Sequence, residues 1–67
     1  MPFLKVPALQ RFMGGRSILF KYDLAQQAGV SYPLLRQAVE EGDEVDEVTV
    51  ERLCDFFACV RDELVRG

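Results

Sequence analysis

Few side chains in this sequence belong to the types that perform covalent chemistry, and their spacing assembles no catalytic set. The chain has no histidine, and its two cysteines, Cys54 and Cys59, have no base next to them in the sequence. The two serines, Ser17 and Ser31, stand where helix caps are expected. Most acidic residues gather in one loop that has no apolar surroundings to raise a carboxyl pKa. We therefore expect a protein that is not an enzyme and uses no cofactor.

The cysteines and acids also fail to form a recognisable metal site. A separation of five positions on or near a helix does not favour a disulfide between Cys54 and Cys59, and no histidine completes a zinc set. The acidic residues 40–47 lack the ligand spacing and the closing glutamate of an EF-hand loop. We predict no metal, and we interpret both cysteines as small buried hydrophobic residues in a reducing compartment.

Length and hydropathy predict one small domain outside the membrane. The 67 residues leave no room for a second domain. No apolar run approaches the roughly 18 residues of a spanning helix, and no signal peptide is visible. We therefore expect a cytoplasmic protein without a membrane partner.

Apolar residues recur with the period of short helices. Val50, Leu53, Cys54 and Phe57 follow the spacing i, i+3, i+4 and i+7, which is a helical core stripe. Similar patterns predict helices over residues 7–13, 21–28, 32–41 and 61–65, with another beginning at Val48 or at a Thr49 cap. The expected fold is all-α, with about five short helices around one core over residues 1–67.

Charge is unevenly distributed along the chain, although its net value is −3. Residues 1–39 carry five basic side chains against one acidic side chain, a net +4. Residues 40–67 carry three basic side chains against ten acidic ones, a net −7. A phosphate-bearing partner responds to the local face of a protein first, so the N-terminal half remains compatible with nucleic acid.

Residues 20–41, FKYDLAQQAGVSYPLLRQAVEE, have the pattern of two short helices joined by a tight turn. Gly29 suits the position after a helix, where a positive φ costs a residue without Cβ little. Ser31 suits the N-cap of the next helix, and Pro33 suits its first turn. The order helix, glycine turn and capped helix is that of a helix-turn-helix.

This segment resembles the lambda-repressor-like, XRE-type family of helix-turn-helix DNA-binding domains. The family pattern of an apolar-Ala pair, a glycine, a β-branched residue and a Ser/Thr cap appears as Leu24-Ala25, Gly29, Val30 and Ser31. The segment VTVERLCDFFACVRDELV resembles the last two helices of the family, so the resemblance covers about residues 18–65. It implies a sequence-specific transcription regulator that binds double-stranded DNA, as a homodimer on a two-fold-symmetric site.

The resemblance also implies which side chains face the DNA. Gln37 is expected to pair with adenine, and Arg36 with guanine or phosphate. Lys21, at the start of the preceding helix, is expected to hold a phosphate. Leu34 is apolar at a position that is often small and polar in the family. The DNA-binding set predicted in this way is Arg16, Lys21, Ser31, Tyr32, Leu34, Arg36 and Gln37.

A surface for association is predicted near the C-terminus. Phe56 and Phe57 are about 100° apart on one helix, so both cannot point into a small core. Phe57 continues the core stripe, which leaves Phe56 toward the surface, where an exposed aromatic residue often marks an interface. The predicted homodimer interface is Phe56, Val60, Leu64 and Val65. In the competing interpretation, Phe56 packs on residues 3–6 of its own chain.

Two other functions remain open at this point. The protein is, alternatively, an interaction module such as an anti-repressor or adaptor, built on the same helix-turn-helix scaffold. In that case the acidic loop 40–47 is a docking surface for a basic protein partner. A lone domain that binds DNA only when a partner supplies the second half-site is the remaining possibility.

Overall fold

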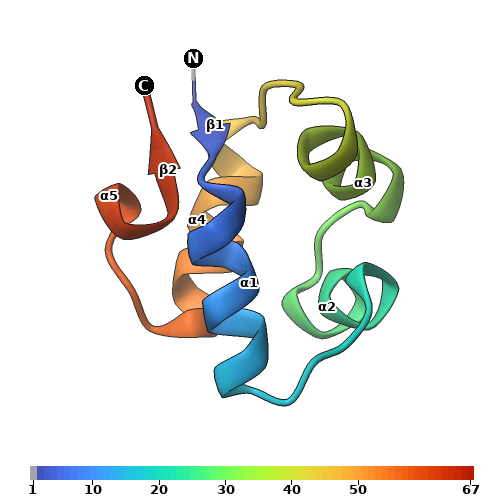
Figure 1. The fold of residues 1–67 in the computed structure, drawn as a ribbon. Coiled ribbons are helices and arrows are strands. Elements are labelled where there is room, and N and C mark those ends of the chain that lie inside the picture. The colour runs from blue at the N-terminus through green and yellow to red at the C-terminus, as the bar shows by residue number, and fades with distance from the viewer. Residues whose placement is uncertain (1) are drawn as a thin grey trace.

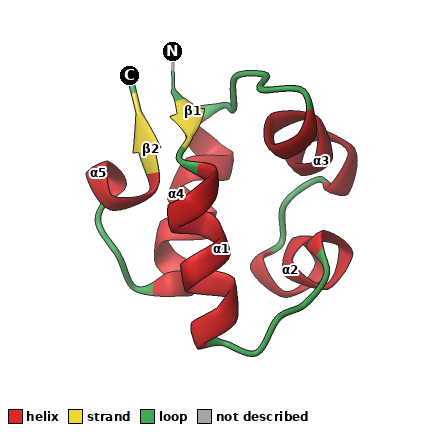
Figure 2. Cartoon of the chain, viewed as in Figure 1, coloured by secondary structure: helices red, strands yellow, loops and turns green. Residues whose placement is uncertain are grey.

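The computed structural model describes residues 2–67, and this part of the chain forms five helices and one short strand pair (Figure 1). Figure 2 shows that helices make up most of the chain, which confirms the all-α expectation. In chain order the elements are β1 (Phe3–Leu4), α1 (Val6–Gly15), α2 (Lys21–Ala28), α3 (Tyr32–Glu40), α4 (Glu47–Phe57), α5 (Arg61–Leu64) and β2 (Val65–Arg66).

Helices α1 and α4 cross the middle of the molecule, and the other elements flank them (Figure 1). On one side lie α2 and α3, which are consecutive in the chain and pack against each other. On the other side lie α5 and β2, while β1 pairs with β2 and also contacts α3. Helices α1 and α4 therefore lie between the α2–α3 pair and the C-terminal elements α5 and β2.

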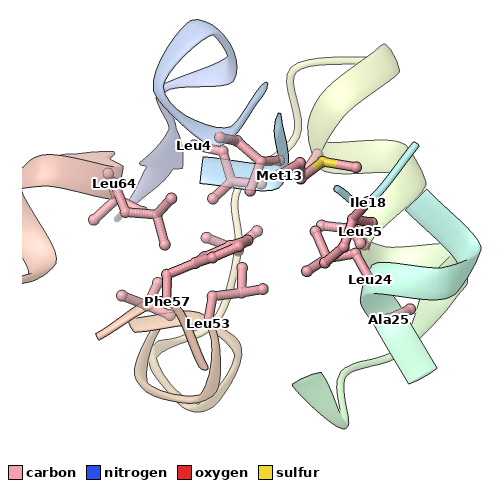
Figure 3. Close-up of a cluster of buried hydrophobic side chains, with 14 residues drawn as sticks. Leu4, Met13, Ile18, Leu24, Ala25, Leu35, Leu53, Phe57 and Leu64 are labelled. Atoms are coloured by element: carbon pink, nitrogen blue, oxygen red, sulfur yellow. The ribbon is translucent and has the colours of Figure 1, made fainter. Parts of the chain in front are cut away.

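The core is centred on leucines, one from each helix. All five are at most 1% exposed, and they are Leu9, Leu24, Leu35, Leu53 and Leu64. Figure 3 shows four of them, from α2 to α5, within the cluster of buried side chains. Val50 and Phe57 are also buried, so three of the four residues of the predicted core stripe are confirmed, whereas Cys54 is partly exposed.

Most helix boundaries agree with the sequence patterns, but α1 begins one residue before the predicted range 7–13 and ends two residues after it, at Gly15. Helix α2 has the predicted bounds, and α3 ends one residue early, at Glu40. Helix α4 begins earlier than predicted because Asp46 takes the N-cap position. Thr49 then lies in the first turn, where its hydroxyl donates a hydrogen bond to the Asp46 carboxylate. The predicted cap role of Thr49 was therefore wrong.

The two ends of the described chain pair with each other. Phe3 and Leu4 face Arg66 and Val65 in an antiparallel register. The amide of Val45, in the acidic loop, donates to the carbonyl of Pro2 at 3.0 Å. The N-terminal segment, whose packing the sequence left open, thus closes the bundle over α5 and the acidic loop.

Part of the predicted dimer interface lies inside this closed end. Leu64 and Val65 are 0% and 1% exposed, because α5 and β2 turn them toward the core. Their assignment to a surface patch was wrong. Phe56 is half-buried and lies edge-on to Phe57, with ring centroids 5.0 Å apart. Val60 is the member of the predicted interface that is fully on the surface.

The buried leucines generate a first prediction, for stability. Leu53→Ala removes a fully buried side chain from the middle of α4 and is expected to cost about 2–5 kcal/mol of unfolding free energy, as measured by urea denaturation. Leu19→Ala is the matched control, because Leu19 is 81% exposed. Equal losses for the two variants would show that α4 does not pack as described.

A second prediction concerns acid unfolding at the start of α4. The hydrogen bond from Thr49 lowers the pKa of Asp46 below its ordinary value of 3.8. A carboxyl whose folded pKa is depressed stabilises the protein above its unfolded pKa, and that contribution is lost as the pH falls through the folded pKa. Thr49→Val is therefore expected to lower the melting temperature at neutral pH, with the difference narrowing below pH 3.8.

The control for this second prediction is Thr49→Ser, which retains a hydroxyl that donates to Asp46. It is expected to preserve the pH dependence of the wild-type melting temperature. If Thr49→Val lowers the melting temperature equally at neutral and acid pH, then lost packing, and not the lost hydrogen bond, accounts for the lower melting temperature.

Candidate nucleic-acid interface

Helices α2 and α3 are joined by the three residues Gly29, Val30 and Ser31. Gly29 has φ 74° and ψ 35°, a left-handed conformation that favours glycine. The amides of Gly29 and Val30 both donate to the carbonyl of Ala25 at 3.0 Å, which ends α2 tightly. Arg52 of α4 donates to the Gly29 carbonyl at 2.5 Å. The turn is thus fixed both by its own backbone and by the central helix.

One stripe of α3 faces the first turn of α2. The stripe consists of Tyr32, Arg36 and Glu40, which are spaced by four residues and therefore follow one line along the helix. The rings of Tyr22 and Tyr32 meet edge to face, with centroids 5.5 Å apart. Near the end of the stripe, Lys21 Nζ lies 3.4 Å from Glu40 Oε2. These contacts join α2 and α3 on their outer side, away from the buried Leu24 and Leu35.

Glu40 lies between two of the predicted DNA-binding cations. It contacts Lys21 through one carboxylate oxygen and Arg36 through the other, at 3.8 Å. All three side chains are partly exposed, so water screens both ion pairs and their contribution to stability is small. The arrangement shows that Lys21 and Arg36, on different helices, lie on the same side of the molecule.

The remaining predicted contacts on α3 differ in exposure. Leu34 is 49% exposed, and Gln37 and Tyr32 are partly exposed. Among residues 2–67, the side-chain amide of Gln37 has no hydrogen-bond partner. It is therefore free to form both hydrogen bonds of an amide with a ligand.

Ser31 takes the predicted N-cap position of α3 but makes no side-chain capping bond. Pro33 occupies the second helical position and has no N–H, so one of the two donors that a cap usually satisfies is missing. The position was predicted correctly, and the capping bond was not.

Arg16 is engaged elsewhere. Its guanidinium donates to the carbonyl of Phe56 at 2.5 Å, and its central carbon lies 4.8 Å from the centre of the Phe56 ring. These contacts tie the end of α1 to α4 and account for the half-buried state of Phe56. The structure therefore groups Lys21, Tyr32 and Arg36 around the α2–α3 contact, whereas Arg16 joins α1 to the C-terminal end of α4.

Apolar residues that were not predicted to contribute also lie at the start of α2. Leu19 and Phe20 are 81% and 65% exposed. Together with Lys21, Tyr22, Asp23 and Tyr32 they line a shallow hollow of about 350 Å³. The signal available in the sequence was the apolar run Ile18-Leu19-Phe20, of which only Ile18 enters the core.

The acidic loop is less uniform than its sequence suggests. Val45 is buried, Asp46 is hydrogen-bonded to Thr49, and Glu47 pairs with Arg61 at 2.8 Å. The hydrogen bond from Arg61 lowers the pKa of Glu47. Glu41, Asp43 and Glu44 are exposed. Part of the acidic run therefore has an intramolecular role at the start of α4.

No group of three His, Cys, Asp or Glu side chains within residues 2–67 is placed to hold a metal ion. None of the helices described here is long and apolar enough to cross a membrane.

Comparison with family models, curated proteins and solved structures gave no match to this chain. The resemblance to the XRE-type family therefore stays a prediction from the motifs within residues 18–65.

Proposed function

We propose that this protein binds double-stranded DNA sequence-specifically and acts as a transcription regulator of the helix-turn-helix type, with α3 as its recognition helix. One observation carries the proposal. Lys21 and Arg36, from different helices, lie on the same side of the molecule, within 3.4 and 3.8 Å of one carboxylate, Glu40. A DNA-binding helix pair needs such an arrangement, because one helix holds the backbone while the next reaches the bases.

In the proposed complex, the exposed side of α3 enters the major groove. The side-chain amide of Gln37 can form two hydrogen bonds with one adenine. Its nitrogen donates to N7, and its oxygen accepts from the N6 amino group. Arg36 contacts guanine or a phosphate, and Leu34 contacts a thymine methyl group. Lys21, at the start of α2, contacts a phosphate and so contributes affinity without base preference.

Glu40 limits how strongly the two cations attract phosphate. In the free protein it holds the side chains of Lys21 and Arg36 near α3. In the complex its negative charge opposes the backbone, so binding to arbitrary DNA is weakened more than binding to a site that also forms base contacts. This effect gives a protein of net charge −3 a means of favouring specific sites.

We include a homodimer and a cytoplasmic location in the proposal. A single chain presents one recognition helix, and an isologous pair would present two on a two-fold-symmetric site. The surface for such pairing is smaller than the four-residue patch expected from the sequence. Val60, which is 63% exposed, and the half-buried Phe56 are the members of that patch still available to a second copy.

A second candidate function is supported by the apolar surface at the start of α2. Leu19 and Phe20 are too exposed to stabilise the monomer, and exposed apolar residues of this size often mark a protein interface. The protein would then be an anti-repressor or adaptor that binds another regulator. Glu41, Asp43 and Glu44 of the acidic loop would favour a basic partner.

Selection of bound sequences from a random duplex pool tests the first function directly. Enrichment of a two-fold-symmetric sequence is expected, and the selected duplex then serves as the specific ligand in fluorescence-anisotropy titrations. No enrichment, together with no binding to generic duplex at low salt, would exclude DNA binding and leave the interaction module.

The third prediction separates base contacts from phosphate contacts. Gln37→Ala is expected to cost about 1–3 kcal/mol of binding free energy on the selected duplex and little on a scrambled duplex. Arg36→Ala is expected to behave in the same way if Arg36 contacts guanine. Lys21→Ala is the comparison, because loss of a phosphate contact weakens binding to both duplexes alike. Equal losses for Gln37→Ala on both duplexes would remove Gln37 from the base-reading set.

The fourth prediction concerns Glu40. Glu40→Gln releases Lys21 and Arg36 and is expected to strengthen binding to scrambled duplex by about fivefold at low salt, while reducing discrimination between the two duplexes. Glu44→Gln is the matched control, because it removes the same charge from the exposed acidic loop. If both variants change the affinity equally, the effect comes from overall charge and not from the position of Glu40.

A further inference from the structure

The C-terminal end of α4 brings the two cysteines of the chain together. Ala58 has φ 56° and ψ 46°, a left-handed conformation that reverses the chain after Phe57. The amide of Cys59 donates to the carbonyl of Cys54 at 3.0 Å, and the amide of Ala58 donates to the carbonyl of Asp55 at 3.4 Å. This pair of bonds defines a Schellman motif, in which the residues at the positions of Cys54 and Cys59 commonly contact each other.

The reversal explains why the spacing of five was misleading in the sequence. On a continuing helix, residues five apart point away from each other, because each residue turns the helix by about 100°. Here the helix ends between the two cysteines. Both side chains are free thiols that pack against the same core cluster but are partly exposed, so the prediction that they are buried was wrong.

We propose that Cys54 and Cys59 form a dithiol modification site, which low-molecular-weight disulfides oxidise to an intramolecular disulfide. The site is independent of the DNA-binding proposal. Closure joins the end of α4 to the segment that leads into α5, without requiring a second chain or a metal.

The two thiols have different roles in this reaction. Cys54 lines an open hollow of about 300 Å³ beside α4, where a reagent can reach it. The pKa of the Cys59 thiol is raised to about 11, first by burial and then by the charge and hydrogen bond of Cys54. Cys54 is therefore the first thiol to attack, and Cys59 reacts second. Once Cys54 is a mixed disulfide it has no thiol left to ionise, so it no longer raises the pKa of Cys59.

The chemistry balances as two thiol–disulfide exchanges. The Cys54 thiolate attacks one sulfur of the reagent, forms a mixed disulfide and expels one reagent thiolate, which takes up a proton. Cys59 then loses its proton, attacks the sulfur of Cys54 and expels the second reagent thiolate. The protein loses two electrons and two protons, and the reagent disulfide becomes two thiols.

Charge around the hollow selects the reagent. Glu47, Glu51 and Asp55 line it together with Arg61, and Arg61 already pairs with Glu47. The surroundings of Cys54 are thus net negative. A cationic disulfide such as cystamine is therefore expected to react faster than the anionic oxidised glutathione, and the difference should shrink as salt is added.

The fifth prediction is tested by intact-mass spectrometry of the reduced protein treated with cystamine. Wild type is expected to form a transient single adduct and then a product lighter than the reduced chain by two hydrogen atoms. Cys59→Ser is expected to stop at the single adduct. Cys54→Ser is expected to react about tenfold more slowly, because the remaining thiol, Cys59, does not line the hollow and burial raises its pKa.

A comparison that needs no variant covers the case in which a substitution unfolds the protein. The closing step is measured for the wild type in buffer and in concentrated urea. Faster closure in buffer supports the proposal, because the fold then holds the thiols together. Closure that is no faster than in urea, or accumulation of a double adduct in buffer, would overturn it.

Discussion

The structure depends on burying five leucines, one from each helix, in a domain too small to contain a second cluster. In a chain of 67 residues, each of these side chains is a large share of the buried apolar area, and the helices are too short to be stable alone. Helix α5, with four residues, persists because Leu64 reaches the core and Val65 continues into the strand pair. Every element that positions the candidate interface is therefore held by packing rather than by local helix propensity.

The same core sets the geometry of α2 and α3. Leu24 and Leu35 face inward, so the Tyr32, Arg36 and Glu40 stripe of α3 is left beside the first turn of α2. An inward face that is fixed by packing allows the outward face to carry charges without affecting the fold. Glu40 is such a charge. It pairs with Lys21 and Arg36 on the exposed side of α3, and these pairs contribute little to stability. In the function proposed, Glu40 instead weakens the affinity of the protein for non-specific DNA.

The sequence predicts well those structural features that depend on residues close together in the chain. Helical spacing identified Val50, Leu53 and Phe57 as core residues, and Gly29 identified the turn. The features that it missed join residues far apart, such as β1 with β2, or depend on where a helix stops. The prediction placed Leu64 and Val65 on the surface because each strand of the pair at this end has only two residues, which is too short for a recognisable sequence pattern. Of the candidate site, Lys21 and Arg36 were found from the motif, but their shared contact with Glu40 required the tertiary structure.

The start of α2 shows how a local defect fits the proposed function. Phe20 is the N-cap residue and offers no side-chain acceptor, which leaves the first amides of α2 without a capping bond at a cost of about 1 kcal/mol. A capped helix start would have its amides occupied. An uncapped one beside Lys21 can donate them to a phosphate oxygen, and the helix dipole favours a negative charge there. In the proposed complex, the DNA backbone would therefore complete the helix start that the missing cap leaves open.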